Sequence, residues 1–165
     1  MKLNTKIKSI DLISSKDKIY FDREGTFPIN YGNNVIDDNQ QINFHSEIEI
    51  IDGRLTCLID INFKYQRNCG RCLEISNTDD INSSTITLNI YGENDYEINY
   101  GDEYYDLSPF ISEMIIEKMD INYICDQKCR GLCSFCGINL NKLSCNHKEK
   151  NSKESPFSSL SQLDL

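Results

Sequence analysis

The 165-residue chain lacks any long hydrophobic segment, which argues against two classes of protein. No run approaches the roughly eighteen apolar residues that a membrane-spanning helix requires, so we expect no membrane association. Residues 1–8 include three lysines where a secretory signal peptide would place its apolar stretch. We therefore expect a cytoplasmic protein, whose thiols are free or metal-bound because the cytoplasm is reducing.

Positive charge is scarce in the middle of the chain. Residues 29–120 contain five basic and eighteen acidic side chains, a net charge of −13 within a total of −9. A body with this charge repels a phosphate backbone, because nucleic-acid affinity comes mainly from cations that displace counterions. Residues 121–150, with five basic and two acidic side chains, are the part that could approach RNA favourably. Strong, direct RNA binding by the body of the protein is therefore not expected.

Cysteine, in contrast, is abundant and clustered. Six potential metal ligands lie within 23 residues near the end of the chain: Cys125, Cys129, Cys133, Cys136, Cys145 and His147. Thiolates at two- and three-residue spacing, followed by a Cys-x-His pair, are typical ligands of a tetrahedral zinc ion. Cys69 and Cys72 form one further pair. The remaining cysteine, Cys57, falls on the apolar row of a predicted strand, which indicates a buried core residue.

The eight potential ligands divide best into two zinc sites, although the sequence leaves other arrangements open. The ligands of the first site would be Cys69, Cys72, Cys125 and Cys129. The ligands of the second, a compact local zinc knuckle, would be Cys133, Cys136, Cys145 and His147. One alternative is a single four-cysteine site made from the Cys69–Cys72 and Cys133–Cys136 pairs, and another is disulfides or a redox role. The sequence therefore predicts one or two Zn²⁺ ions.

No pattern in the sequence predicts catalysis. Four protein ligands leave no open position for an activated water, so the zinc sites would be structural. His45 is a lone histidine in a predicted strand, and such a histidine is usually a surface or hydrogen-bonding residue. The segment Cys69-Gly-Arg-Cys72 leads into predicted β structure, whereas a redox Cys-x-x-Cys motif usually opens a helix after a parallel strand. We predict that the protein is not an enzyme.

Hydrophobic patterning predicts an α+β fold, in which an antiparallel β domain carries one packed amphipathic helix and a C-terminal zinc-knuckle module. Alternating apolar residues predict strands over 42–50, 55–65 and 85–91. The Asp52-Gly53 dipeptide predicts a hairpin turn between the first two. Weaker patterning in residues 1–30 predicts short strands.

The helix is predicted over residues 107–119, where apolar residues recur at helical spacing and Pro109 suits the first turn. Its apolar stripe should pack against the sheet. We therefore divide the chain into a β domain of residues 1–120, a cysteine-rich zinc module of residues 121–150, and a short C-terminal tail of residues 151–165.

An acidic, tyrosine-rich loop, residues 91–106, precedes the predicted helix. It contains six carboxylates and five tyrosines, with no lysine or arginine. Two interpretations remain open. The segment is either a solvated loop or a docking surface for a basic protein, with carboxylates attracting arginines and rings supplying apolar contact.

Several motifs resemble those of the YceD-like family, long catalogued as a domain of unknown function and named for large ribosomal RNA subunit accumulation. The first is Cys69-x-x-Cys72-Leu73-Glu74, and the second is Asp106-Leu107 at the start of the predicted helix, with Glu113 within it. The most specific runs Cys125-x3-Cys129-x-Gly131-Leu132-Cys133-x2-Cys136-Gly137-x-Asn139-Leu140-Asn141. Together with the tail motif Pro156-Phe157-x-x-Leu160-x-x-Leu163, the resemblance covers about residues 45–165.

Two positions depart from the family pattern. Cys145-Asn146-His147 stands where the family usually has Cys-x-Cys, and Ser134 stands where a proline is common. Neither change removes a potential zinc ligand, because histidine is also a zinc ligand.

The resemblance implies a factor in bacterial large ribosomal subunit biogenesis, needed for accumulation of large-subunit (23S) rRNA. Family genes commonly lie beside the gene for a small, basic ribosomal protein of the large subunit, which implies a shared task. With the acidic body, this leads us to expect binding to such a protein or to the pre-ribosomal large subunit. The alternative is a zinc-knuckle nucleic-acid-binding protein, whose 121–150 module contacts RNA directly.

Overall fold

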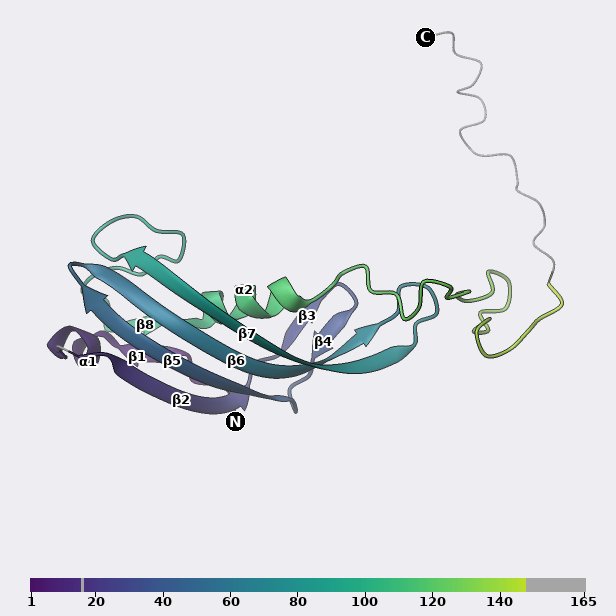
Figure 1. The fold of residues 1–165 in the computed structure, drawn as a ribbon, viewed down its shortest axis with the longest axis horizontal. Helices are drawn as coiled ribbons and strands as arrows, with labels where there is room; N and C mark the ends of the chain where they lie inside the picture. Colours follow the sequence, from purple (N-terminus) through teal and green to yellow (C-terminus); the bar gives the residue numbers. More distant parts are fainter. Residues whose placement is uncertain (16, 148–165) are drawn as a thin grey trace, which may run out of the picture.

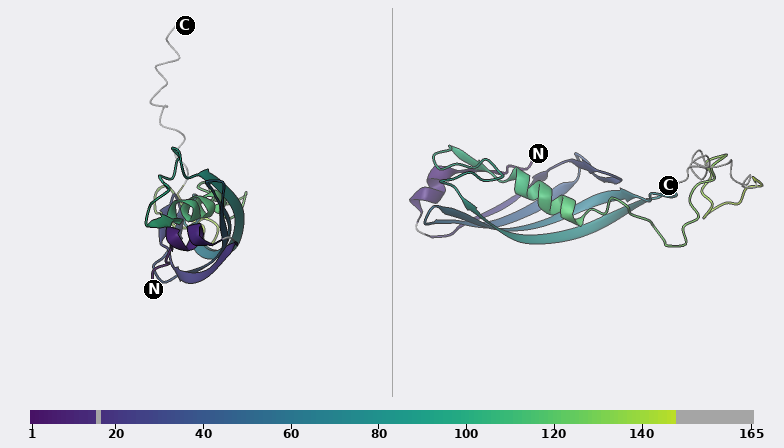
Figure 2. Two further views of the ribbon diagram at one scale, coloured as in Figure 1. Left: turned by 90° about the vertical axis from the view of Figure 1, so that its left-hand side faces the viewer. Right: turned by 90° about the horizontal axis from the view of Figure 1, so that it is seen from above.

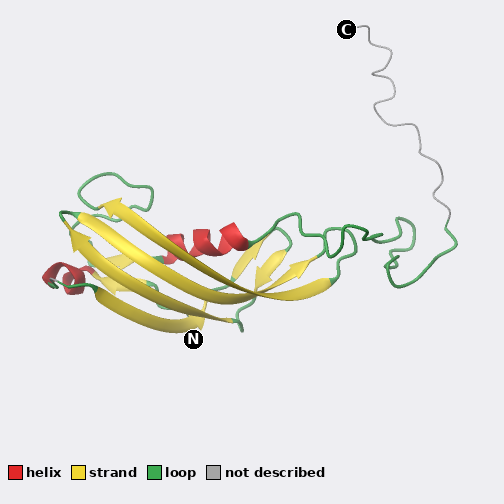
Figure 3. Cartoon of the chain, in the orientation of Figure 1, coloured by secondary structure: helices red, strands yellow, loops and turns green. Residues whose placement is uncertain are grey.

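The computed structural model describes residues 1–15 and 17–147, which form eight strands and two helices (Figures 1 and 3). In chain order these are β1 (Lys6–Lys8), α1 (Ser9–Ser14), β2 (Ile19–Thr26), β3 (Ile29–Tyr31), β4 (Asn34–Ile36), β5 (Gln41–Ile51), β6 (Arg54–Asn68), β7 (Ile75–Asn89), β8 (Tyr104–Asp106) and α2 (Ser108–Lys118). Within this part of the chain, neither helix has the length and apolarity that crossing a membrane requires. The predicted tail, residues 151–165, lies outside the described residues.

The centre of the fold is an antiparallel arrangement of β5, β6 and β7. The main sheet has the order β2-β5-β6-β4-β3, and β7 pairs with the other side of β6 along its full length. Asp52 and Gly53 turn β5 into β6 with φ angles of 48° and 73°, a left-handed conformation that both residue types tolerate. The hairpin predicted from the sequence is therefore confirmed.

Two regions differ from the prediction. The strand expected over 85–91 is the end of a 15-residue strand, β7. Its first ten residues, 75–84, are mostly polar and give little hydrophobic signal, so the pairing with β6 determines their extended conformation. Near the N-terminus the short helix α1 lies between β1 and β2, where only short strands were predicted.

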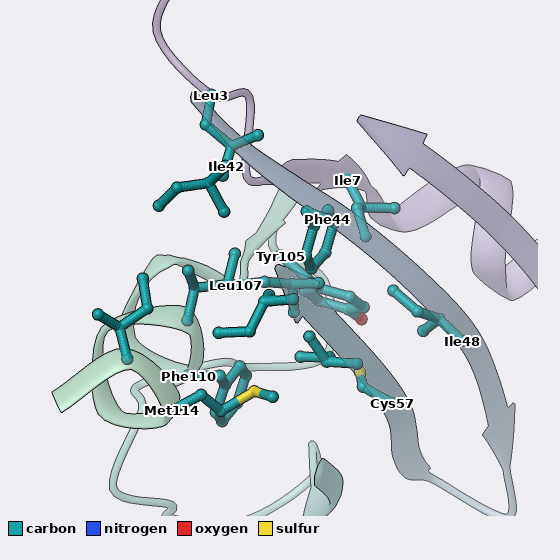
Figure 4. Packing of buried hydrophobic residues seen from close by; sticks show 14 of the residues in the cluster. Leu3, Ile7, Ile42, Phe44, Ile48, Cys57, Tyr105, Leu107, Phe110 and Met114 are labelled. Carbon is teal, nitrogen blue, oxygen red and sulfur yellow. The ribbon is translucent and has the colours of Figure 1, made fainter. Parts of the chain in front are cut away.

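The core lies on the concave face of the curved sheet, where α2 and the small β1–β8 sheet cover it (Figure 2). Figure 4 shows Phe110 and Met114 of α2 grouped with Cys57 of β6 inside this cluster. Cys57 is 1% exposed, and burial raises the pKa of its thiol to about 12. The predicted core role of Cys57 is therefore confirmed.

The carboxylate of Asp106, just before helix α2, links the helix to the N-terminal segment through hydrogen bonds. Asp106 Oδ1 accepts hydrogen bonds from the Ser108 backbone N–H at 2.9 Å and from Thr5 Oγ1 at 2.7 Å. Burial raises the pKa of Asp106, but these hydrogen bonds outweigh it and hold the pKa below its ordinary value. The helix spans Ser108–Lys118, close to the predicted range of 107–119, with Pro109 in its first turn.

Candidate metal centres

Two groups of potential metal ligands form where β6 turns into β7 and in the segment after α2 (Figure 1). Cluster 1 consists of Cys69, Cys72, Cys125 and Cys129, and cluster 2 consists of Cys133, Cys136, Cys145 and His147. Within each cluster the four ligand atoms lie within 4.8 Å of one another. Each cluster therefore offers the four donors of a tetrahedral metal site.

The spacing of these donors fits an ion of the size of zinc. In cluster 1, Sγ of Cys69 lies 3.9 Å from Sγ of Cys129, and Sγ of Cys72 lies 3.6 Å from Sγ of Cys125. A zinc ion about 2.3 Å from each sulfur would separate two ligand sulfurs by about 3.8 Å. In cluster 2, Cys133 Sγ lies 3.5 Å from Cys145 Sγ and 3.9 Å from His147 Nδ1. These separations are close to those of a tetrahedral zinc site, so both donor sets could hold such an ion.

Cluster 1 is assembled by backbone contacts between two segments far apart in the sequence. Cys69 comes directly after β6, and its neighbour Gly70 donates a backbone hydrogen bond to Tyr123 O at 2.9 Å. The backbone N–H groups of Arg71 and Cys125 both donate to Cys69 Sγ at 3.4 Å. The chain after α2 is thereby held beside the β6–β7 turn, which brings the two cysteine pairs together.

Hydrogen bonds of this kind favour the thiolate, the form of cysteine that binds metals. Burial raises the pKa of Cys69, but backbone N–H groups, first that of Cys125, outweigh it and lower the pKa to about 6. In cluster 2, the backbone N–H groups of Cys136 and Phe135 lower the pKa of Cys133 to about 6. Burial also raises the pKa of Cys129, but hydrogen bonds, first that from the Asn141 side chain, outweigh it and lower the pKa. Two cysteines of cluster 1 and one of cluster 2 are therefore favoured as thiolates by their surroundings.

Asn141 supports cluster 1 from the opposite side. Its Nδ2 donates to Cys129 Sγ at 3.2 Å, and its Oδ1 accepts the Arg130 backbone N–H at 2.8 Å. Gly131 has a φ of 72°, and a Cβ on it would lie 3.1 Å from the carbonyl oxygen of Arg71, so the two segments pack closely here. Cluster 1 is therefore supported by Asn141, a residue that lies between the ligands of cluster 2 in the sequence.

Cluster 2 is a tight local knuckle. The backbone N–H of Cys133 donates to Ile138 O at 2.9 Å, and the N–H of Gly137 donates back to Cys133 O at 2.9 Å. Gly137 has a φ of 72°, which turns the chain directly after Cys136. The ring of Phe135 stacks on His147 with centroids 5.7 Å apart. Phe135 is 57% exposed, so the tip of the knuckle presents an aromatic ring to solvent.

Glu74 connects the β6–β7 turn with the chain between the cluster 2 ligands. Its carboxylate pairs with Lys142 Nζ at 2.7 Å and accepts a hydrogen bond from Asn139 Nδ2 at 3.3 Å. The ligand spacing gave no indication of these contacts. Their only sequence signal is that Glu74, Asn139 and Asn141 belong to the motifs that carry the family resemblance.

The structure groups the eight residues as the two-site interpretation predicts. The Cys69–Cys72 and Cys133–Cys136 pairs belong to different clusters, so the alternative single four-cysteine site is not formed. All eight cysteines of the chain lie within the described residues and are free thiols. His45 is placed on the sheet, where its Nδ1 lies 2.7 Å from Asp22 Oδ1, in agreement with its predicted hydrogen-bonding role.

The acidic loop, residues 91–106, is folded onto the domain and is not extended into solvent. Its Ile98 is buried, and the ring of Tyr96 packs 4.0 Å from that of Phe110 in α2. Tyr96 also donates a hydrogen bond to Glu113 Oε2 at 2.5 Å, which is the first cause that raises the pKa of this tyrosine to about 12. Its last residues form β8, paired with β1, which the sequence did not predict.

Two comparisons connect the chain with known proteins. A family model described as "Large ribosomal RNA subunit accumulation protein YceD" matches residues 58–164, more than half of the chain. The chain is also similar to "Large ribosomal RNA subunit accumulation protein YCED homolog 1, chloroplastic" from Arabidopsis thaliana, with 37% identity over 57 residues. This alignment covers 33% of the chain and only 18% of the relative's length. No solved structure matches the chain.

Proposed function

Because the chain belongs to the YceD family of large ribosomal RNA subunit accumulation proteins, we propose that it is a non-enzymatic factor needed for accumulation of large-subunit rRNA. The observation that carries this proposal is that the matched region, residues 58–164, contains every residue of clusters 1 and 2. The similar protein from Arabidopsis thaliana has the same role in its name.

In this role, both clusters would hold zinc as a structural ion. Four protein donors complete a tetrahedral zinc site and leave no position for an activated water. Cluster 1 would then fasten the segment after α2 to the end of β6, and cluster 2 would close the knuckle that follows. Because an unfolded chain has no preformed site, metal binding would contribute to the stability of this part of the fold.

The partner would be a basic large-subunit ribosomal protein, either free or on the pre-ribosomal large subunit. Residues 29–120 carry a net charge of −13, which attracts cationic proteins and repels RNA. The acidic loop exposes Tyr91 and Tyr100, whose rings lie 4.6 Å apart, among exposed carboxylates. Aromatic rings next to carboxylates favour contact with arginine-rich surfaces, through apolar and cation–π contact as well as charge.

RNA contact through the cysteine-rich module is the alternative function, and the exposed ring of Phe135 favours it. Such a ring can stack on an unpaired base, and Lys128 and Arg130 belong to the same segment. However, Lys142 is already paired with Glu74. Zinc bound to four thiolates also retains net negative charge, which would offset the cations of this module. The charge distribution therefore favours the protein partner.

A strain that lacks this gene tests the proposed role. We expect fewer large subunits relative to small ones and less mature large-subunit rRNA, while small-subunit rRNA stays near normal. Sedimentation of ribosomal subunits and quantification of both rRNAs measure these effects. An unaltered subunit profile would contradict the role.

A charge-neutralised variant tests the docking mechanism separately. Its acidic loop would carry the matching amide at five positions: Glu93, Asp95, Glu97, Asp102 and Glu103. We expect weaker binding to purified basic large-subunit ribosomal proteins, and a smaller difference at high salt, because exposed charges are screened beyond about 8–10 Å at physiological ionic strength. A control variant loses the same number of charges on the sheet: Asp22, Glu24, Glu47, Glu49 and Asp60. Normal subunits in a strain with the loop variant would exclude this docking mechanism but leave the role intact.

A further inference from the structure

Strand β7 is a long sheet edge without a partner on its outer side. It pairs with β6 residue by residue, from Ile75 opposite Asn68 to Asn89 opposite Arg54, with no bulge. Within residues 1–15 and 17–147, no other strand pairs with it (Figure 1). In the same part of the chain, no residue of β7 makes a backbone-to-backbone hydrogen bond outside the strand pairs, and only the carbonyl of its last residue, Asn89, accepts a side-chain hydrogen bond, from Asn94 Nδ2 at 3.4 Å. Every second residue of β7 therefore directs its backbone N–H and C=O away from β6.

This edge also lacks most of the features that usually protect a sheet edge from pairing, although its charges, Asp79 and Asp80, oppose pairing with another acidic strand. Natural edge strands are kept short, bent by bulges, or marked with lysine or proline. β7 has 15 residues, and its sequence contains no lysine, arginine, proline or glycine. The other sheet margins differ, because β3 has only three residues and β2 is joined at Thr26 by Lys2 and Leu3 of the N-terminal segment. Among the described strands of the main sheet, β7 is therefore the longest strand with one unpaired side.

Carboxylates lie on both faces beside this edge. Asp79 and Asp80 are adjacent residues of β7, so their side chains point to opposite faces of the sheet. Asn82 Nδ2 lies 3.2 Å from Glu117 Oε2 of α2, which places a further carboxylate next to the inner face of the strand. On the neighbouring strand β6, Lys64 pairs with Asp79 at 3.2 Å.

The negative charge beside β7 indicates which kind of partner could pair with its open edge. RNA would be repelled by these carboxylates, and it has no backbone that could continue the ladder. A second copy of the chain would bring another set of the same carboxylates to the edge. An extended segment rich in lysine and arginine could pair with the free backbone groups, and its side chains would alternate between Asp79 on one face and Asp80 on the other.

We propose that β7 is the docking strand for an extended, basic segment of a partner protein, which adds to the main sheet beside it. This inference rests on the proposed function for the basic class of the partner, and it assigns a second surface, in addition to the acidic loop, that binds this partner. Backbone pairing would supply affinity that does not depend on the partner's sequence, while Asp79 and Asp80, one on each face, would select cationic side chains.

The test uses the full-length protein and a synthetic peptide of about twelve residues, in which lysine or arginine alternates with valine or threonine. At about 3.4 Å per residue, this peptide spans most of β7. The control peptide has the same sequence but carries N-methyl groups on alternate residues, so it keeps the charge and loses one hydrogen-bonding edge. Amide hydrogen exchange followed by NMR is the readout. We expect the first peptide to protect alternate amides of β7, and the N-methylated peptide to bind at least tenfold more weakly.

Two matched variants complete the experiment. Ser83→Lys with Thr85→Lys places cations on exposed positions of β7, and Gln41→Lys with Asn43→Lys makes the same charge change on exposed positions of β5. We expect the β7 variant to bind the unmodified peptide at least tenfold more weakly than the β5 variant does. Circular dichroism and thermal melting establish that both variants remain folded.

Several results would overturn the inference. Equal binding of the two peptides, or equal loss in the two lysine variants, would show charge attraction without strand pairing. Concentration-dependent dimers that the β7 variant abolishes would show that a second copy occupies the edge. If the gene deletion lowers large subunits but the β7 variant restores them fully, the docking strand is wrong and the proposed function stands. If the deletion changes nothing, the proposed function fails independently of β7.

Discussion

Replacing Asn141 with alanine should weaken metal binding at cluster 1 and leave cluster 2 nearly unchanged. The substitution removes the hydrogen bond from Asn141 Nδ2 to Cys129 Sγ, 3.2 Å long, and leaves the Arg130 backbone N–H without its acceptor at 2.8 Å. A hydrogen bond to a charged group contributes about 1.5–3 kcal/mol. We therefore expect a loss of about 10- to 100-fold in metal affinity, the usual range for outer contacts of a metal ligand.

Cobalt(II) substitution allows the two clusters to be followed separately, because a four-sulfur set and a three-sulfur, one-nitrogen set give different visible spectra. Titration of the cobalt-loaded protein with a chelator then measures the affinity of each cluster. Asn43→Ala, at an exposed position on β5, is the matched control and should not change either affinity.

A change below about twofold at cluster 1 would refute the reasoning, because it would mean that the Asn141 amide contributes no net stabilisation to the bound thiolate. An equal loss at both clusters would also refute it. That result would show that the alanine substitution loosens the whole segment between Cys129 and Cys145, not one sulfur contact.

Three further predictions follow from the same structure. Metal analysis after gentle purification should find two zinc ions per chain; less than half an equivalent, with no titratable thiols, would favour disulfides instead. Cys72→Ser should lower the melting temperature more than Cys136→Ser does, because cluster 1 joins distant segments whereas cluster 2 closes locally; equal, global unfolding of both variants would contradict this. Asp106→Ala should lower the free energy of unfolding by about 1 kcal/mol near pH 7 in urea denaturation. The pKa of Asp106 is lower in the folded protein than its ordinary value, so its stabilising contribution is lost as the carboxylate protonates below about pH 4. The difference between the wild type and the variant should therefore shrink as the pH falls below about 4, and a difference that stays constant down to the acid unfolding of the wild type would count against this role.

The short-range ligand pairs could be predicted because they depend on local spacing, and the two-site grouping was favoured by donor number, although cluster 1 joins Cys72 to Cys125 across 53 residues. Cys133 and Cys136 are only three residues apart, so any short turn brings them close together. Eight donors are also the number that two tetrahedral sites need. The contacts of Asn141 and Glu74 could not be predicted in the same way. They join segments separated by 12 and 68 residues, so they exist only after the chain has folded.

The fold likewise has one part that the sequence predicts and another part that it does not. Strands β5 and β6 alternate buried and exposed residues, and this pattern is visible in the sequence. The first part of β7 is mostly polar on both faces: its inner side chains are only partly buried, except Asn82, which is buried and donates a hydrogen bond to Met114 O of α2. Its strand conformation comes from pairing with β6, and no pattern of hydrophobic residues predicts it.

The continuous pairing of β6 with β7 forms a long two-stranded ribbon that separates the acidic loop from the metal clusters. Fifteen residues at about 3.4 Å each give a ribbon about 50 Å long. The acidic loop follows one end of β7, and clusters 1 and 2 lie at the other end of the ribbon (Figure 1). This separation is several times the Debye length of about 8 Å, so charges at one end are screened from a ligand at the other. The two ends of the ribbon are therefore held at a set distance, and deleting two paired residues from each strand would bring them about 7 Å closer.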